Sequence, residues 1–356
     1  MQDIVGNKTL RDLWEEMAEQ CSDQIFLTFE DCYNRISHHT YREFNTMINR
    51  AANCFLEMGV QKGELVAVQL RSSPEFMYAW FGLAKIGAVM VPLNTAYKYA
   101  ECKYIIEKCE IRRVVMEKEF LNIYHSEQAK ELKLSDLILA RTEERVTGTV
   151  NLLEEMKEQP ETLVEIRPLR SDDPVEIIFT SGTTSRPKGA VFTHCNTVYA
   201  GIFQAWQCGM THDDVVMTVM PCFYISFQLM AVLPALTLGS RLVVEERYSA
   251  RRFWNQIRQH KVTITEVMPM IVRTMLLQPV DPEEQNHCVK QVFFSLGMST
   301  EEKEAYEARF KIRLLNCYGL TESLVCVAGD PYFGERRWPS VGKAGISYAL
   351  KIVDEK

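Results

Sequence analysis

The stretch that decides the fold class of this sequence is Ile178-Phe-Thr-Ser-Gly-Thr-Thr-Ser-Arg-Pro-Lys-Gly189. Its apolar start predicts a strand, which leads into small and hydroxylated residues and then into two cations, Arg186 and Lys188. Small residues let successive backbone N–H groups turn toward an anion, and hydroxyl groups add further donors. A Walker A loop has Gly before Lys, whereas here Lys188 precedes Gly189. The stretch therefore predicts an anion-binding loop of another kind, with a plain turn between strands as the alternative.

Outward from this stretch, apolar runs alternate with helical patterns. The clearest helix is predicted over residues 40–59, where apolar residues recur every three or four positions between Thr40 and Gly59. Further strands are predicted at 65–70, 88–92, 113–116, 175–180, 190–193, 214–220, 241–244, 262–267, 289–295 and 312–316. Such alternation is typical of largely parallel sheets with helices on their faces, so the predicted class is layered α/β.

The length of 356 residues predicts two subdomains. Residues from about 141 to 173 are rich in Glu, Thr and Pro, which predicts a surface connection. We therefore place a first αβ subdomain at 1–170 and a second at 171–356, which carries the loop and both later motifs.

Composition excludes several classes of protein. With 47% hydrophobic and 24% charged residues the chain is typical of a globular protein, and a net charge of −7 argues against nucleic acid as a partner. The charge-free stretch 215–240 is broken by Pro221 and Pro234, so we predict a buried core segment rather than a membrane span. Eleven scattered cysteines without CxxC spacing, and no signal-peptide pattern, indicate reduced thiols in a cytoplasmic protein.

Several short stretches of this sequence resemble the motifs of one enzyme family. Thr180–Gly189 resembles the phosphate loop of the adenylate-forming enzymes, which include acyl-CoA synthetases, adenylation domains and luciferases. Tyr318-Gly-Leu-Thr-Glu-Ser323 is similar to that family's adenine and magnesium signature, and Met220-Pro-Cys-Phe-Tyr-Ile225 is similar to its acyl-pocket segment. Ser295-Leu-Gly-Met-Ser299 resembles the segment beside the adenine, and the strings at 41–44 and 62–67 resemble N-terminal landmarks.

This resemblance implies an acyl-CoA synthetase N-terminal domain that uses ATP, Mg²⁺ and CoA to convert a small-molecule carboxylate into a thioester through acyl-AMP. It implies catalytic roles for Thr183, Lys188, Thr321 and Glu322, with Thr183 and Glu322 as magnesium ligands. The nucleotide-binding residues that it implies are Thr180, Ser181, Gly182, Thr184, Ser185, Gly189, Ser295, Gly297, Asn316, Tyr318 and Gly319. Because a carboxylate is already ionised at neutral pH, such a reaction needs positioning and charge neutralisation rather than a general base.

Four further strings, at 205–208, 248–254, 268–270 and 337–340, resemble family members that act on carnitine- and crotonobetaine-like betaines. The trimethylammonium group of such substrates favours aromatic faces. We predict that Trp206, Phe223, Tyr224 and Phe227 form this pocket; ordinary core aromatics are the alternative.

Two departures from the family pattern affect these expectations. Tyr224 stands where the family commonly has His, which puts the shape of the acyl site in question. The chain ends at Lys356, before the segment in which family members carry a ribose-binding Asp and a C-terminal lid domain with a catalytic Lys. We therefore expect weak ATP binding, slow adenylation and no effective thioester formation from this polypeptide.

Alternatives remain at this level. The chain is either such a ligase, a non-catalytic fragment that binds nucleotide or acyl group, or a ligase for a fatty or aryl acid. An adenylation domain that loads a carrier is disfavoured, because the chain contains no carrier domain. Homo-oligomerisation stays open.

Overall fold

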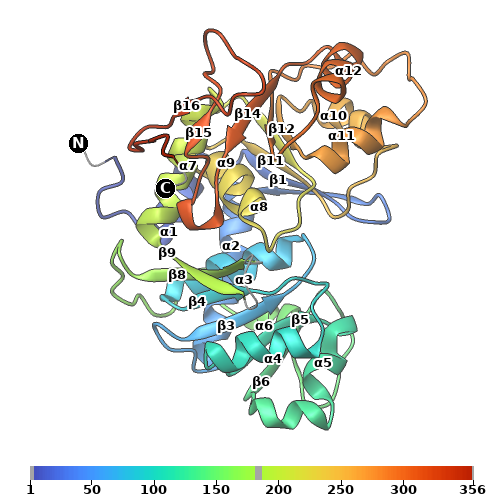
Figure 1. The fold of residues 1–356 in the computed structure, drawn as a ribbon. Coiled ribbons are helices and arrows are strands. Elements are labelled where there is room, and N and C mark those ends of the chain that lie inside the picture. Colours follow the sequence, from blue (N-terminus) through green and yellow to red (C-terminus); the bar gives the residue numbers. More distant parts are fainter. Residues whose placement is uncertain (1–3, 181–186, 355–356) are drawn as a thin grey trace.

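Two β-sheets, each with helices packed on it, make up the molecule. The computed structural model describes residues 4–180 and 187–354. In Figure 1, sheet A forms the upper half and sheet B the lower half, and helices α2 and α3 lie between them.

Sheet A has nine strands among the described residues. In spatial order they are β16 (Lys343–Ala344), β15 (Ala328–Gly329), β14 (Leu314–Tyr318), β13 (Gln291–Ser295), β12 (Ile264–Val267), β10 (Val215–Thr218), β11 (Arg241–Glu245), β1 (Ile25–Glu30) and β2 (Ile36–Thr40). The run from β14 to β1 is parallel throughout, and antiparallel strands flank it on both sides.

Sheet B has seven strands among the described residues. Their order is β7 (Val150–Asn151), β6 (Asp136–Ala140), β5 (Arg113–Glu117), β3 (Leu65–Gln69), β4 (Val89–Pro92), β8 (Pro174–Thr180) and β9 (Lys188–Thr193). All neighbours are parallel except the β8–β9 hairpin. The predicted α/β class with largely parallel sheets is confirmed.

The helices connect these strands and cover the sheets. They are α1 (Leu10–Gln20), α2 (Tyr41–Glu57), α3 (Pro74–Ile86), α4 (Tyr99–Lys108), α5 (Leu121–His125), α6 (Leu152–Glu158), α7 (His194–Gln207), α8 (Ile225–Phe227), α9 (Leu233–Leu238), α10 (Phe253–His260), α11 (Pro269–Leu276) and α12 (Thr300–Phe310). Shorter turns are η1 (Lys118–Phe120), η2 (Gln128–Leu132), η3 (Gln228–Val232) and η4 (Thr321–Ser323).

Local sequence explains the best-predicted helix, α2. Thr40 accepts a hydrogen bond from the backbone N–H of Glu43, and the Glu43 carboxylate accepts one from the Thr40 N–H. This reciprocal capping box satisfies two donors that a helix start otherwise leaves unpaired.

The sheets exchange strands across residue 170, where we placed the boundary between subdomains. Strands β1 and β2 belong to sheet A, whose other strands all come after residue 210, whereas β8 and β9 join sheet B. One buried hydrophobic cluster reflects this interleaving, because it contains Trp14 and Phe26 from the first third of the chain, with ring centroids 5.0 Å apart, together with Val243 of β11. The first and last thirds of the chain therefore share one core.

Two predicted segments differ in detail. The expected surface connection at about 141–173 contains strand β7 and helix α6, and Asn53 of α2 binds its remainder by donating to the carbonyls of Pro160 and Thr162. The charge-free stretch folds into β10 followed by the helical turns α8, η3 and α9. Across the described residues no helix is both long and apolar enough to cross a membrane.

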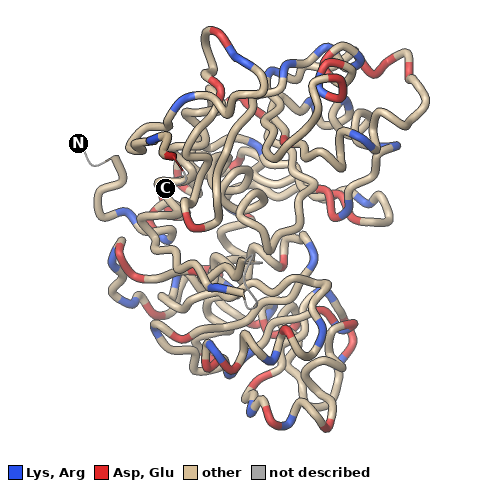
Figure 2. Tube along the Cα trace, viewed as in Figure 1, with Lys and Arg blue, Asp and Glu red and all other residues tan. Residues whose placement is uncertain are grey.

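Charged residues of both signs are interspersed along the whole trace (Figure 2). No part of that trace shows a large basic region, in keeping with the net charge of −7.

Candidate active site

The predicted motifs gather at the carboxyl ends of the parallel strands of sheet A. Ser295 and Tyr318 are the last residues of the paired strands β13 and β14, and Met220 follows β10. In open α/β sheets ligands bind outside the carboxyl ends of strands, because the loops there leave a crevice. The topology thus brings three of the predicted motifs to one edge.

The turn after β14 presents the predicted adenine and magnesium residues to solvent. Gly319 is required there, because a Cβ atom would lie 2.6 Å from the Val325 carbonyl oxygen. Ser323 closes the turn by accepting a hydrogen bond of 2.9 Å from the Leu320 N–H. Tyr318 is 47% exposed and Glu322 is also exposed, so an aromatic face and a carboxylate are both available to a ligand.

Glu322 fits the magnesium role that the resemblance implies, because Mg²⁺ prefers hard oxygen donors and this carboxylate is free to turn toward a ligand. Thr321, the adjacent predicted residue, is half-buried at the start of η4. The second predicted magnesium ligand, Thr183, lies outside the described residues.

The β8–β9 hairpin holds the two ends of the predicted phosphate loop. Thr180 and Lys188 are paired in register, and the Thr180 hydroxyl donates a long hydrogen bond of 3.4 Å to the Lys188 carbonyl. Lys188 and Gly189 are exposed. The intervening residues of that prediction, Ser181, Gly182, Thr183, Thr184, Ser185 and Arg186, lie outside the described part of the chain.

The segment after β13 is open and strained. Leu296 has φ of 77°, a left-handed conformation that a branched side chain rarely adopts. No heavy atom lies within 4 Å of a Cβ built on Gly297, which is exposed beside half-buried Ser295. Ser299 then caps α12.

Asn316 makes hydrogen bonds to other parts of the protein rather than facing this crevice. It is 5% exposed, and its side-chain amide donates a hydrogen bond of 2.8 Å to the Ser340 carbonyl. Its backbone N–H donates to Asp330. Asn316 thereby ties β14 to the segment that follows β15, a connection that the sequence pattern did not indicate.

A pocket of about 470 Å³ opens where the two sheets meet. Its lining residues are Arg71, Ser72, Thr95, Val219, Met220, Pro221, Phe223, Tyr224, Glu246, Arg247, Tyr248, Met268, Met270 and Ile271. The carboxyl ends of β3, β10, β11 and β12 all contribute, so both sheets shape it.

The charged residues that border this pocket differ in whether another side chain neutralises them. Burial raises the pKa of Glu246, but hydrogen bonds from Arg141 and from the Cys32 N–H outweigh it, so the pKa lies below its ordinary value. The Glu246 charge is thus directed to Arg141, away from the pocket. Arg71 pairs with Glu117 and Glu119. Arg247 carries no ion pair among the described residues, so the pocket is better suited to an anionic or neutral group than to a cation.

The four aromatic residues predicted for the acyl pocket do not assemble into one cage. Phe223 and Tyr224 line the pocket, with ring centroids 4.6 Å apart. Phe227 is fully buried and packs edge-on against Phe76 at 6.1 Å. Trp206, on α7, is 54% exposed and lies outside that pocket's lining.

Trp206 belongs instead to an aromatic cluster beside the Tyr318–Ser323 turn. Phe203 lies 5.8 Å from Trp206, 5.8 Å from Tyr199 and 6.0 Å from Tyr348, between ring centroids. The Tyr348 hydroxyl donates a hydrogen bond of 2.8 Å to the carbonyl of Ser323. Spacing at 199, 203 and 206 already places three of these rings on one helix face, but nothing in the sequence indicated Tyr348.

Comparisons with known proteins agree with this geometry. Residues 14–356 match the family model described as AMP-binding enzyme. The crotonobetaine/carnitine–CoA ligases of Citrobacter koseri and Proteus mirabilis are each 43% identical to the chain, over 99% of this chain and 69% of their own length.

Solved structures share the fold at lower identity. The anthranilate CoA ligase AuaEII, in complex with anthranoyl-AMP, superposes with a TM-score of 0.89 at 22% identity over 98% of this chain and 67% of that one. A benzoate CoA ligase from Burkholderia xenovorans superposes with a TM-score of 0.85 at 19% identity over 98% and 68%. At these identities the likeness concerns the fold alone.

Proposed function

The chain belongs to the AMP-binding enzyme family, and from this premise we propose that it activates a carboxylic acid with ATP for transfer to CoA. The observation that carries the proposal is the placement of the Tyr318–Ser323 turn and the β8–β9 hairpin. The hairpin carries both ends of the predicted phosphate loop, and the turn carries the predicted adenine and magnesium residues. Both elements present exposed polar residues. The 43% identity to crotonobetaine/carnitine–CoA ligases supports the reaction type.

In this reaction a carboxylate oxygen forms a bond to the α-phosphorus of ATP, and the bond to the bridging oxygen of the β-phosphate breaks. Pyrophosphate leaves with that electron pair. The thiol sulfur of CoA then bonds to the acyl carbon, AMP leaves with the electron pair of the broken acyl carbon–oxygen bond, and the thiol proton passes to solvent. The carboxylate is ionised at neutral pH, so the chain's own residues orient and neutralise charge. Lys188 supplies a cation for the phosphates, and Thr321 a hydroxyl donor near the reacting phosphate. When bound through Glu322, Mg²⁺ supplies neutralisation of phosphate charge.

For the substrate, we propose a betaine of the carnitine or crotonobetaine type. The identity to ligases of that name supports it, and so does the aromatic cluster of Tyr199, Phe203, Trp206 and Tyr348. A quaternary ammonium group donates no hydrogen bonds and is attracted by aromatic faces, each contact contributing about 0.5–2 kcal/mol. Because the Tyr348 hydroxyl is bonded to Ser323, this cluster lies next to the turn that carries Glu322.

Crotonobetaine and crotonate are a matched pair of acids for testing this choice. We would measure acid-dependent ATP–pyrophosphate exchange, together with calorimetric binding of the sulfamoyl analogues of both acyl-AMPs. A preference for the betaine is expected, and Trp206→Leu is expected to reduce that preference about 2- to 30-fold. Tyr33→Leu removes a ring that is 75% exposed elsewhere, and is expected to change nothing.

Each outcome separates the alternatives. Exchange with aryl or fatty acids but not with betaines would contradict the substrate proposal while keeping the ligase. Analogue binding without exchange would favour the non-catalytic reading. Failure of both readouts with every acid would contradict the proposed reaction itself.

A further inference from the structure

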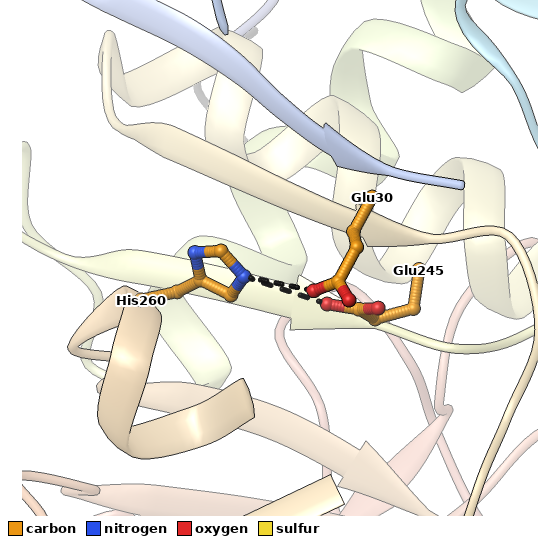
Figure 3. Close-up of side chains that lie close together, drawn as sticks. All are labelled: Glu30, Glu245 and His260. Carbon is orange, nitrogen blue, oxygen red and sulfur yellow. Dashed lines mark hydrogen bonds and ion pairs between the residues drawn. The ribbon is translucent and has the colours of Figure 1, made fainter. Parts of the chain in front are cut away.

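Three buried metal-ligating side chains converge away from the nucleotide signatures. Glu30 ends β1, Glu245 ends the neighbouring strand β11, and the two residues are directly paired in register. His260 ends α10 and points between the two carboxylates (Figure 3). Glu30 is 1% exposed, Glu245 is 2% exposed and His260 is 6% exposed.

Each side chain has one ligand atom that no group outside the cluster engages. Arg252 donates to Oε1 of Glu30, and Gln256 donates to Oε2 of Glu245. The remaining atoms are Glu30 Oε2, Glu245 Oε1 and His260 Nε2, which all lie within 4.8 Å of one another. Nε2 is 3.3 Å from Glu30 Oε2 and 3.7 Å from Glu245 Oε1. Donors that fix the far atom of a ligand are the usual second layer of a metal site.

Hydrogen bonding alone does not satisfy this cluster. The single N–H that His260 can carry on Nε2 serves one carboxylate, and Glu245 Oε1 has no hydrogen-bond partner among the described residues. Oε1 of Gln256, which is 2% exposed and one helical turn before His260, is likewise without a partner there. Buried polar atoms without partners are costly and uncommon in folded proteins. Both atoms therefore lack a partner that a metal ion or a water could supply.

We propose that Glu30, Glu245 and His260 bind a divalent transition-metal ion of the zinc class. Four-coordinate Zn²⁺ with ligands about 2.0–2.1 Å away has ligand atoms about 3.3 Å from one another, close to the two separations from Nε2. A mixed nitrogen and oxygen set selects zinc-class ions over Mg²⁺ and Ca²⁺, which take oxygen ligands. A water completes the fourth position.

The ion would tie β1 to β11 and to the end of α10. Its charge offsets the two buried carboxylates, while Arg252 remains with Glu30 at the solvent side. Glu246, next along the chain from Glu245, lines the pocket between the sheets, so the ion stabilises one wall of that pocket. This role is structural, and it is independent of the proposed ligase reaction.

The competing explanation is a metal-free cluster in which Glu245 is protonated and shares its proton with Glu30 or His260, because burial raises the pKa of Glu245 and lowers that of His260. Direct measurement on the wild-type chain separates the two. We expect one tightly bound Zn²⁺ per chain after removal of loosely held metal, and visible absorption bands of tetrahedral Co²⁺ on substitution. The zinc X-ray absorption spectrum should show a first shell of nitrogen and oxygen only. A shell containing sulfur would assign the metal to cysteines and overturn the proposal, as would the absence of stoichiometric binding.

Variants locate the ion. Glu245→Gln and His260→Gln are each expected to weaken Zn²⁺ binding at least tenfold and to abolish the zinc-dependent rise in Tm. His212→Gln removes an exposed imidazole beside Asp213, and is expected to leave both quantities unchanged. Zinc affinity unchanged in both cluster variants would overturn the assignment. Should a variant fail to fold, the first-shell spectrum of the wild-type chain still decides.

Discussion

Glu176 offers the sharpest test of the electrostatics inside this fold. It lies in β8, in the interior of sheet B, with 0% exposure, and neither carboxylate oxygen has a hydrogen-bond partner among the described residues. Burial raises its pKa from the ordinary 4.5 to about 8, and the nearby amide of Gln228 opposes the shift only in part, because that amide donates its hydrogen bond to the Cys222 carbonyl. Glu176 is therefore neutral in the folded protein at neutral pH.

The sign and size of the effect follow from this shift. A carboxyl whose pKa is raised by folding contributes stability that is fully present below pH 4.5 and is lost as the pH rises through about 8. Each pH unit within that window changes the free energy of unfolding by about 1.4 kcal/mol. Glu176→Gln keeps the shape, cannot ionise, and can donate to Gln228 Oε1, which lacks a partner. Relative to wild type, the variant should gain about 3 kcal/mol between about pH 5.5 and pH 7.5.

Urea unfolding of both chains at these two pH values measures this gain. Glu158→Gln, an exposed carboxyl at the end of α6, is the matched control, and its difference from wild type should hardly change with pH. A Glu176→Gln difference that is equal at both pH values would refute the raised pKa. A variant that loses stability as the pH rises would refute the sign.

Three further perturbations test packing and the site. Gly201→Ala on α7 places a Cβ 2.8 Å from a backbone carbonyl oxygen of α9 and should cost about 1–3 kcal/mol of unfolding free energy in a urea titration. Gly297→Ala is the control, because open space surrounds its new methyl group, and it should cost almost nothing in the same titration. Arg309→Ala leaves the Glu284 carboxylate, which is 5% exposed, without its cation, and should cost about 3–5 kcal/mol by chemical denaturation; a cost below 1 kcal/mol would contradict this reading. Glu322→Gln should weaken calorimetric binding of ATP in the presence of Mg²⁺ while leaving Tm unchanged, and equal affinity with and without the substitution would remove Glu322 from the magnesium role.

Local patterns predicted most individual elements well. The period of apolar residues after Thr40 predicted α2 to within two residues. Apolar runs located β3, β4 and β8 for the same reason, since buried parallel strands are apolar on both faces. The alternation of such elements was enough for the α/β class.

Pairings between distant segments could not be predicted in this way. The apolar pattern of β1 is the same whichever sheet it joins, and its neighbour β11 begins more than 200 residues later. The direction in which an aromatic ring points could not be predicted from the sequence either. Phe227 lies in the expected acyl-pocket segment but faces the core, whereas Tyr348 reaches the Ser323 carbonyl from outside every recognised motif. Glu30, Glu245 and His260 converge only through the same long-range pairing.

The interleaving of the sheets has a consequence for biosynthesis. Leu27 pairs with Leu242, so β1 has no partner in sheet A, apart from its hairpin with β2, until some 215 further residues have been made. At about 5–20 residues per second this wait lasts roughly 10–40 s. During that time the edge of β1 that later pairs with β11 is exposed on the nascent chain. Chaperone binding to the emerging N-terminal segment, and its release once α10 has been synthesised, would be the signature of this topology in a ribosome-bound chain.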